Sequence, residues 1–197
     1  MALIEAGTVV AAAHDVVGRG HAERLVPMIA ALPDRGRAAR ILVDVGPGSF
    51  TGVRVGIAAA IGLGIGWSAE VQGYSSLALL AAAGFAARPS LPALAVVLEG
   101  GHGEVFMQAF RSSPFLTEAA PLRSLAPAAA LEALGAIPAI GSGVRHLSAI
   151  TADGDFAEAL PNAIDALLLP PDFAGLPPRP IYGRAPDAKT LAERGLA

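Results

Sequence analysis

The spacing of apolar and polar positions predicts alternating strands and helices in the first half of the chain. Apolar segments on both sides of residues 5–7 (Glu-Ala-Gly) are typical of a β-hairpin. The other expected elements are helices at residues 21–32, 51–67 and 76–87 and strands at residues 40–45 and 71–74. Ser75 or Ser76 is expected to cap the third helix. This order predicts an α/β unit.

The second half repeats this order after residues 88–92, where two prolines interrupt the helical pattern. Its expected elements are a hairpin of strands 93–98 and 104–110, a helix at 127–134, a strand at 137–140, a glycine loop at 141–143, a helix at 162–169 and a proline-rich extended segment at 170–180. The shared order of elements predicts two similar α/β lobes, residues 1–88 and 89–197.

Composition excludes several classes of protein. The 197 residues include no cysteine, which excludes disulfides and thiol nucleophiles. A net charge of −3 provides no field to hold a phosphate backbone, so we do not expect nucleic-acid binding by this chain alone. The longest uncharged stretches, 55–69 and 71–87, are shorter than the ~20 apolar residues of a membrane span. Because the N-terminus also lacks a basic region before its apolar one, we expect a cytoplasmic protein with no membrane contact.

Side chains suited to catalysis or metal binding are scattered along the sequence. The four histidines, His14, His21, His102 and His146, form no pair at the spacing of metal ligands. No serine lies in the GxSxG motif of serine hydrolases. The carboxylates of Glu99 and Glu104 flank a predicted hairpin turn, where solvation is more common than catalysis. We therefore predict neither catalytic nor metal-binding residues.

A glycine loop, GPGSFTG, connects the predicted strand at 40–45 to the helix that follows. Gly46, Gly48 and Gly52 permit backbone torsions that direct amides toward the helix N-terminus, where an anion can bind. The loop lacks both the GxGxxG spacing and the P-loop ending. A tight turn capped by Ser49 or Thr51 is the alternative. The residues alone leave both interpretations open.

Two rows of small and apolar residues run along the helix predicted at 51–67. They are Gly56, Ala60 and Gly64, and next to them Val53, Ile57, Ile61 and Ile65. Small residues at this spacing let a second backbone approach closely. The neighbouring element is either the sheet of this chain or the helix of a partner.

The segment at residues 46–66, GPGSFTGVRVGIAAAIGLGIG, strongly resembles the TsaB family, also called YeaZ. HAERLVPMI, GYSSLALLA, GEVFMQAF and PIYGRAPDAK resemble further segments of that family, in the same order. The resemblance implies duplicated actin-like (ribonuclease H-like) lobes and a glycoprotease-like protein without catalytic activity. It also implies a function: binding and activating the related TsaD subunit, which transfers threonylcarbamoyl to N6 of adenosine 37 in tRNA.

The resemblance further implies where partners bind. In the family, two helices of the first lobe form the homodimer or the heterodimer with TsaD, and they align with residues 21–32 and 51–67. The predicted interface residues are Leu25, Met28, Ile29, Leu32, Val53, Gly56, Ile57, Ala60, Ile61 and Gly64. The implied partners are TsaD, TsaE, a second copy when the chain is alone, and tRNA only within the complex.

Two features depart from the family pattern. Family members have a strand and an Asp-Thr-Ser/Thr-like turn before the segment that matches Leu3 onward, and here that strand is missing. We therefore expect a first lobe without its N-terminal strand, and no tight ATP binding. Residues 99–102 read Glu-Gly-Gly-His instead of an Asp-Ala-Arg-like stretch. The alternatives are an actin-like ATPase that uses the Gly46 loop, a glycoprotease acting alone, or a homodimer with another client.

Overall fold

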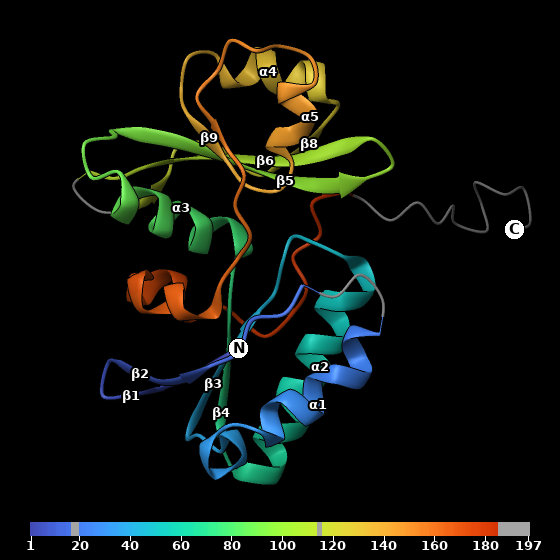
Figure 1. The fold of residues 1–197 in the computed structure, drawn as a ribbon, viewed down its shortest axis with the longest axis vertical. Helices are drawn as coiled ribbons and strands as arrows, with labels where there is room; N and C mark the ends of the chain where they lie inside the picture. The colour runs from blue at the N-terminus through green and yellow to red at the C-terminus, as the bar shows by residue number, and fades with distance from the viewer. Residues whose placement is uncertain (17–19, 114–115, 185–197) are drawn as a thin grey trace, which may run out of the picture.

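The computed structural model describes residues 1–16, 20–113 and 116–184, which form an α/β protein (Figure 1). Its helices and strands are β1 (Ala2–Glu5), β2 (Thr8–Ala12), α1 (His21–Ala30), β3 (Arg40–Asp44), α2 (Phe50–Trp67), β4 (Glu70–Tyr74), α3 (Ser76–Ala87), β5 (Ala93–Gly101), β6 (Glu104–Arg111), β7 (Thr117–Glu118), β8 (Arg123–Leu125), α4 (Pro127–Leu134), β9 (Ala139–Ile140), α5 (Val144–Ser148) and β10 (Phe156–Ala157). The described residues also form three 3-10 helices, η1 (Pro33–Gly36), η2 (Ala163–Leu168) and η3 (Pro171–Phe173).

The core lies around a six-stranded sheet in the order β10-β9-β5-β6-β7, with β8 also paired to β6. Alternate residues of β5 point to opposite faces of this sheet. Leu94 and Val96 pack with α3 on one face, whereas Ala95 and Val97 pack with α4 and α5 on the other. Figure 1 shows the two helical layers on either side of the sheet. Burial of both faces explains why β5 is apolar at consecutive positions.

The first lobe contains two separate pairs of strands. β1 and β2 form an antiparallel hairpin, and β3 and β4 form a parallel pair with Leu42 opposite Gln72. Among the described residues, no ladder of hydrogen bonds joins the hairpin to β3. Helices α1 and α2 lie beside each other next to these strands (Figure 1). The lobe is therefore an α/β unit whose sheet is interrupted.

The predicted elements of the first half are confirmed to within two residues, with α1 ending at Ala30 rather than at position 32. In the second half, the helix expected at 162–169 is the 3-10 helix η2, capped by the side chain of Asn162. The helix that follows the glycine loop at 141–143 is instead the short α5, which we did not predict. Strands β7, β8 and β10 were also missed, because two or three residues carry too little periodicity.

Candidate functional site

The glycine loop is a turn that begins helix α2. Gly46 has a φ of 95°, and a Cβ there would lie 3.3 Å from the nitrogen of Gly48, so glycine is required. The Oγ of Ser49 accepts a hydrogen bond from the amide of Gly52 at 3.3 Å and caps the helix. The predicted cap at Ser49 is therefore confirmed, whereas Thr51 is exposed. The anion-binding interpretation stays a prediction.

Asp44 connects this loop to helix α3. Its carboxylate accepts hydrogen bonds from the amide of Gly46 at 2.8 Å and from the hydroxyl of Ser76 at 2.6 Å. Burial raises the pKa of Asp44, and these hydrogen bonds only partly offset that rise. Sequence reasoning missed Asp44 and considered Ser76 only as a possible cap of α3, a role that Ser75 has in the structure. The available signal was an acidic residue at the end of an apolar strand, two residues before the first glycine of the loop.

A cavity of about 430 Å³ lies between the two lobes beside the glycine loop. Asp44 and Ser76 line one side of it, and Leu98, Glu99 and Ser142 line the other. Partial burial raises the pKa of the Glu99 carboxyl group. Hydrogen bonds from Arg145 and His146 lower this pKa by more, so that it lies below its ordinary value. The acidic groups of this cavity are thus hydrogen-bonded within the chain.

Glu99 and Glu104 do not form a carboxylate pair that shares a partner. The carboxylate of Glu104 accepts hydrogen bonds from Ser124 at 2.6 Å and from Arg184 at 3.4 Å, whereas Glu99 contacts α5. In the part of the chain that the structure describes, no three His, Asp or Glu side chains are placed to hold a metal ion.

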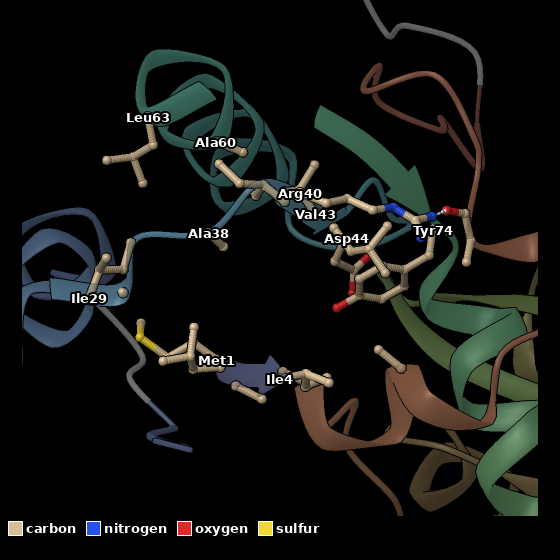
Figure 2. Close-up of a pocket in the computed structure, with 18 of the residues that line it drawn as sticks. Met1, Ile4, Ile29, Ala38, Arg40, Val43, Asp44, Ala60, Leu63 and Tyr74 are labelled. Atoms are coloured by element: carbon tan, nitrogen blue, oxygen red, sulfur yellow. Dashed lines mark hydrogen bonds between the residues drawn. The ribbon is translucent and has the colours of Figure 1, made fainter. Parts of the chain in front are cut away.

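The predicted apolar face of α1 points into the lobe. Leu25, Ile29 and Leu32 line an apolar cavity of about 770 Å³ between α1, α2 and the strands, while Met28 is half-buried. Figure 2 shows Ile29 from α1 and Leu63 from α2 on the same side of this space. Leu25, Ile29 and Leu32 thus point toward the chain's own strands across this cavity, and the expectation that they contact a partner stays a prediction.

The small-residue row of α2 also faces inward. A Cβ at Gly64 would lie 2.4 Å from Cγ2 of Val71 in β4, and Ala60 is only 5% exposed. Ile57 is buried, and a Cβ at Gly56 would contact Val43 of β3. This row therefore faces β3 and β4 of the chain itself, and its contact with a partner helix stays a prediction.

A different row of small residues faces outward from α2. Ala58, Gly62 and Gly66 are exposed, and a Cβ at either glycine would have no heavy atom within 4 Å. Beside them, Ile61 is 40% exposed and Ile65 is 78% exposed. We call these five residues the outer face of α2. Among the predicted interface residues, Ile61 belongs to this face, and Val53 is half-buried over the glycine loop.

An aromatic cluster lies at the amino end of α2. The guanidinium carbon of Arg54 lies 3.6 Å from the ring centre of Phe50, and Arg54 donates a hydrogen bond of 2.7 Å to the hydroxyl of Tyr182. All three side chains are exposed. Sequence reasoning missed this cluster, because Tyr182 is 128 residues from Arg54.

The family model described as TsaD, tRNA N6-adenosine threonylcarbamoyltransferase, matches residues 13–163. The chain belongs to this family. A structure of a Pseudomonas aeruginosa protein with similarity to peptidase YeaZ is 25% identical, has a TM-score of 0.73, and the match covers 93% of each chain. A structure of YeaZ from the same organism is 25% identical with a TM-score of 0.72, over 92% of each chain. No curated protein sequence matches the chain.

Within this family the chain is of the TsaB (YeaZ) type and has an actin-like fold, as its motifs led us to expect. The family acts in tRNA modification. In the described part of the chain, α2 is the one helix whose length and composition suffice to cross a membrane, a test that core helices of soluble proteins also pass. The outer face of α2 is thus an exposed apolar surface on a protein of this family.

Proposed function

We propose that the chain is a non-catalytic subunit that binds the catalytic subunit TsaD and thereby activates N6-threonylcarbamoylation of adenosine 37 in tRNA. In this proposal the outer face of α2 makes the contact with TsaD or, in its absence, with a second copy of the chain. TsaE and tRNA join only in the assembled complex. Because tRNA is the substrate, the complex acts in the cytoplasm.

The outer face of α2 carries this proposal. Ile61 and Ile65 place branched apolar side chains in solvent, next to positions 58, 62 and 66, which have little or no side chain. Such a surface permits close packing of a second helix and burial of both isoleucines. At its amino end the cluster of Phe50, Arg54 and Tyr182 adds aromatic and guanidinium groups, the types most enriched at binding hot spots.

The polar groups between the lobes support a non-catalytic role. Asp44 is held by Ser76 and Gly46, and Glu99 by Arg145 and His146. Each carboxylate therefore has a structural partner in the chain. Tight ATP binding is not part of the proposal.

The decisive experiment is copurification of tagged TsaD with the Ile65→Glu variant. A carboxylate at this position would have to be buried without a partner in the interface, so we expect at least about tenfold weaker binding. Modification of tRNA by the reconstituted complex should fall in parallel. The variant should stay folded because position 65 is 78% exposed.

The matched control is Ile150→Glu, which makes the same change at a 55% exposed residue of the second lobe, just after α5. This control should bind TsaD like the unaltered chain. If Ile65→Glu also binds TsaD with unaltered affinity, the proposed contact surface is wrong.

The family description favours one alternative, an enzyme that acts alone, because it names a transferase. The actin-like fold makes an ATPase the specific form of this alternative, with the glycine loop as its phosphate site. Calorimetry of the isolated chain with ATP and Mg²⁺ separates the two functions. Micromolar binding without TsaD would favour the enzyme.

A further inference from the structure

The exposed side of α2 continues beyond its outer face to the amino end of the helix. Arg54 is exposed, and it precedes Ala58 by four residues and Ile61 by seven. Residues at this spacing lie on one side of a helix. The guanidinium of Arg54 therefore extends the row of exposed side chains that contains Ile61 and Ile65.

Two aromatic side chains hold the Arg54 guanidinium in position. Its central carbon lies 3.6 Å from the ring centre of Phe50 and 5.6 Å from that of Tyr182. Nε and Nη2 donate hydrogen bonds to the Tyr182 hydroxyl at 3.2 and 2.7 Å. In the part of the chain that the structure describes, Arg54 forms no ion pair and no other hydrogen bond. The N–H groups of Nη1 and the second N–H of Nη2 are thus available to a partner.

Tyr182 lies in a segment that is anchored on both lobes. The amide of Ile181 donates a hydrogen bond of 2.7 Å to the carbonyl of Val45 in the first lobe. A Cβ at Gly183 would lie 2.3 Å from Cδ1 of Phe106 in the second lobe, so the backbone there packs against that ring. These contacts fix the hydroxyl to which the guanidinium donates. A guanidinium that is already oriented loses less entropy when it binds.

The positive charge of Arg54 has no counter-charge on its helix. Arg54 is the only charged residue of α2, and the Tyr182 hydroxyl that accepts its hydrogen bonds is neutral. A partner that covers this side of α2 has to provide an anion, because a charge that is buried without one is strongly destabilising. The parallel N–H groups of a guanidinium match the two oxygens of a carboxylate or a phosphate.

The surroundings of Arg54 favour a carboxylate of a protein over a phosphate of a nucleic acid. Binding to a phosphate backbone relies on several basic side chains, whereas α2 has one and continues as an apolar surface. The net charge of −3 also opposes such binding. An apolar row that ends in a fixed guanidinium instead fits a partner helix with apolar residues and one Asp or Glu.

A second copy of the chain does not offer this carboxylate. In a symmetric dimer both subunits contribute the same patch. Because α2 contains neither Asp nor Glu, pairing of two such helices would cover two guanidinium groups without a carboxylate on either helix. The charge of Arg54 therefore favours a different protein over self-association.

We propose that Arg54 selects a heterologous partner by binding an Asp or Glu carboxylate of that protein through two parallel hydrogen bonds. The carboxylate lies on a partner helix whose apolar residues cover Ile61 and Ile65. In taking TsaD as this partner, the inference rests on the proposed function.

The Arg54→Met variant tests the inference through two affinities, one for TsaD by surface plasmon resonance and one for a second copy by analytical ultracentrifugation. Methionine keeps an unbranched apolar side chain and removes the charge. We expect at least about tenfold weaker binding to TsaD, with self-association equal or tighter. Arg54→Lys keeps the charge without the planar group and should have an intermediate affinity for TsaD. The matched control Arg123→Met, at an exposed position of β8, should change neither affinity.

A double-mutant cycle locates the carboxylate on TsaD. Asp→Asn and Glu→Gln substitutions on the TsaD surface are combined with Arg54→Met, and one of them should weaken binding only when Arg54 is present. The inference is overturned if Arg54→Met binds TsaD normally, if no acidic residue couples to Arg54, or if self-association weakens along with TsaD binding. Loss of affinity for tRNA alone would assign Arg54 to a phosphate and also overturn it. Normal TsaD binding by Ile65→Glu would count against the proposed function instead.

Discussion

At the scale of single residues, the carboxylate of Asp44 is held by hydrogen bonds from two other segments of its surroundings, the glycine loop and α3. It lies at the end of β3, accepts hydrogen bonds from Gly46 and Ser76, and has a pKa raised by burial. Burial, and then the charge of Asp44, raise the pKa of the Tyr74 hydroxyl as well. A buried carboxylate with a raised pKa favours folding when protonated and opposes it when charged.

The Asp44→Asn variant tests this linkage. The folded chain keeps the Asp44 proton to a higher pH than the unfolded chain, so this group lowers the free energy of unfolding as pH rises above its ordinary pKa of 3.8. The asparagine side chain has nearly the same shape as that of aspartate but has no titratable group. We expect the variant to gain stability relative to the unaltered chain between pH 4 and neutral pH. Urea unfolding across that range measures the difference in free energy of unfolding between the two proteins. A difference that does not change with pH would contradict a raised pKa of Asp44.

At the scale of elements, α2 shows why a helix cannot be oriented from its sequence alone. It is apolar on nearly every side, so the rows 56-60-64 and 58-62-66 are equivalent by periodicity. Contacts with Val43 and Val71 decide that the first row faces the sheet. The existence of this helix and its cap at Ser49 could be predicted, because both depend on neighbouring residues.

Two glycine substitutions in α2 should have opposite effects on stability. At Gly62 a methyl group meets open space, so Gly62→Ala should raise the free energy of unfolding by about 1 kcal/mol through helix propensity. At Gly64 the methyl group would overlap Val71, and Gly64→Ala should cost about 1–3 kcal/mol. Denaturant unfolding of both variants measures these changes. A stabilising Gly64→Ala would show that α2 does not pack on β4 in this register.

At the scale of the whole molecule, the two lobes differ in how completely their sheets are paired. The six-stranded sheet is covered on both faces, whereas the first lobe has two separate strand pairs with a cavity between them. The segment after η3 strengthens the first lobe, since Leu176 pairs with Gly73 and the amide of Ile181 donates to Val45. The strands of the six-stranded sheet should therefore be locally more stable than the separate strand pairs of the first lobe.

Hydrogen exchange of the chain should show this difference directly. Amides of Ala95 and Val96 in the centre of β5 should exchange only by global unfolding, because strands on both sides and layers on both faces protect them. Amides on the unpaired edges of β1 and β3 should exchange orders of magnitude faster. Equal protection in β3 and β5 would contradict the interrupted sheet.

The sequence by itself determined the strands and helices of the first half, the turn that begins α2 and the family, because each depends on residues close together in the chain. Tertiary structure alone decided which side of α2 faces outward, which polar groups meet at Asp44, and that a cavity lies between β1 and β3. These features arise from contacts between segments distant in sequence, and the nearly uniform apolar character of α2 carries no signal that could distinguish its inner from its outer side.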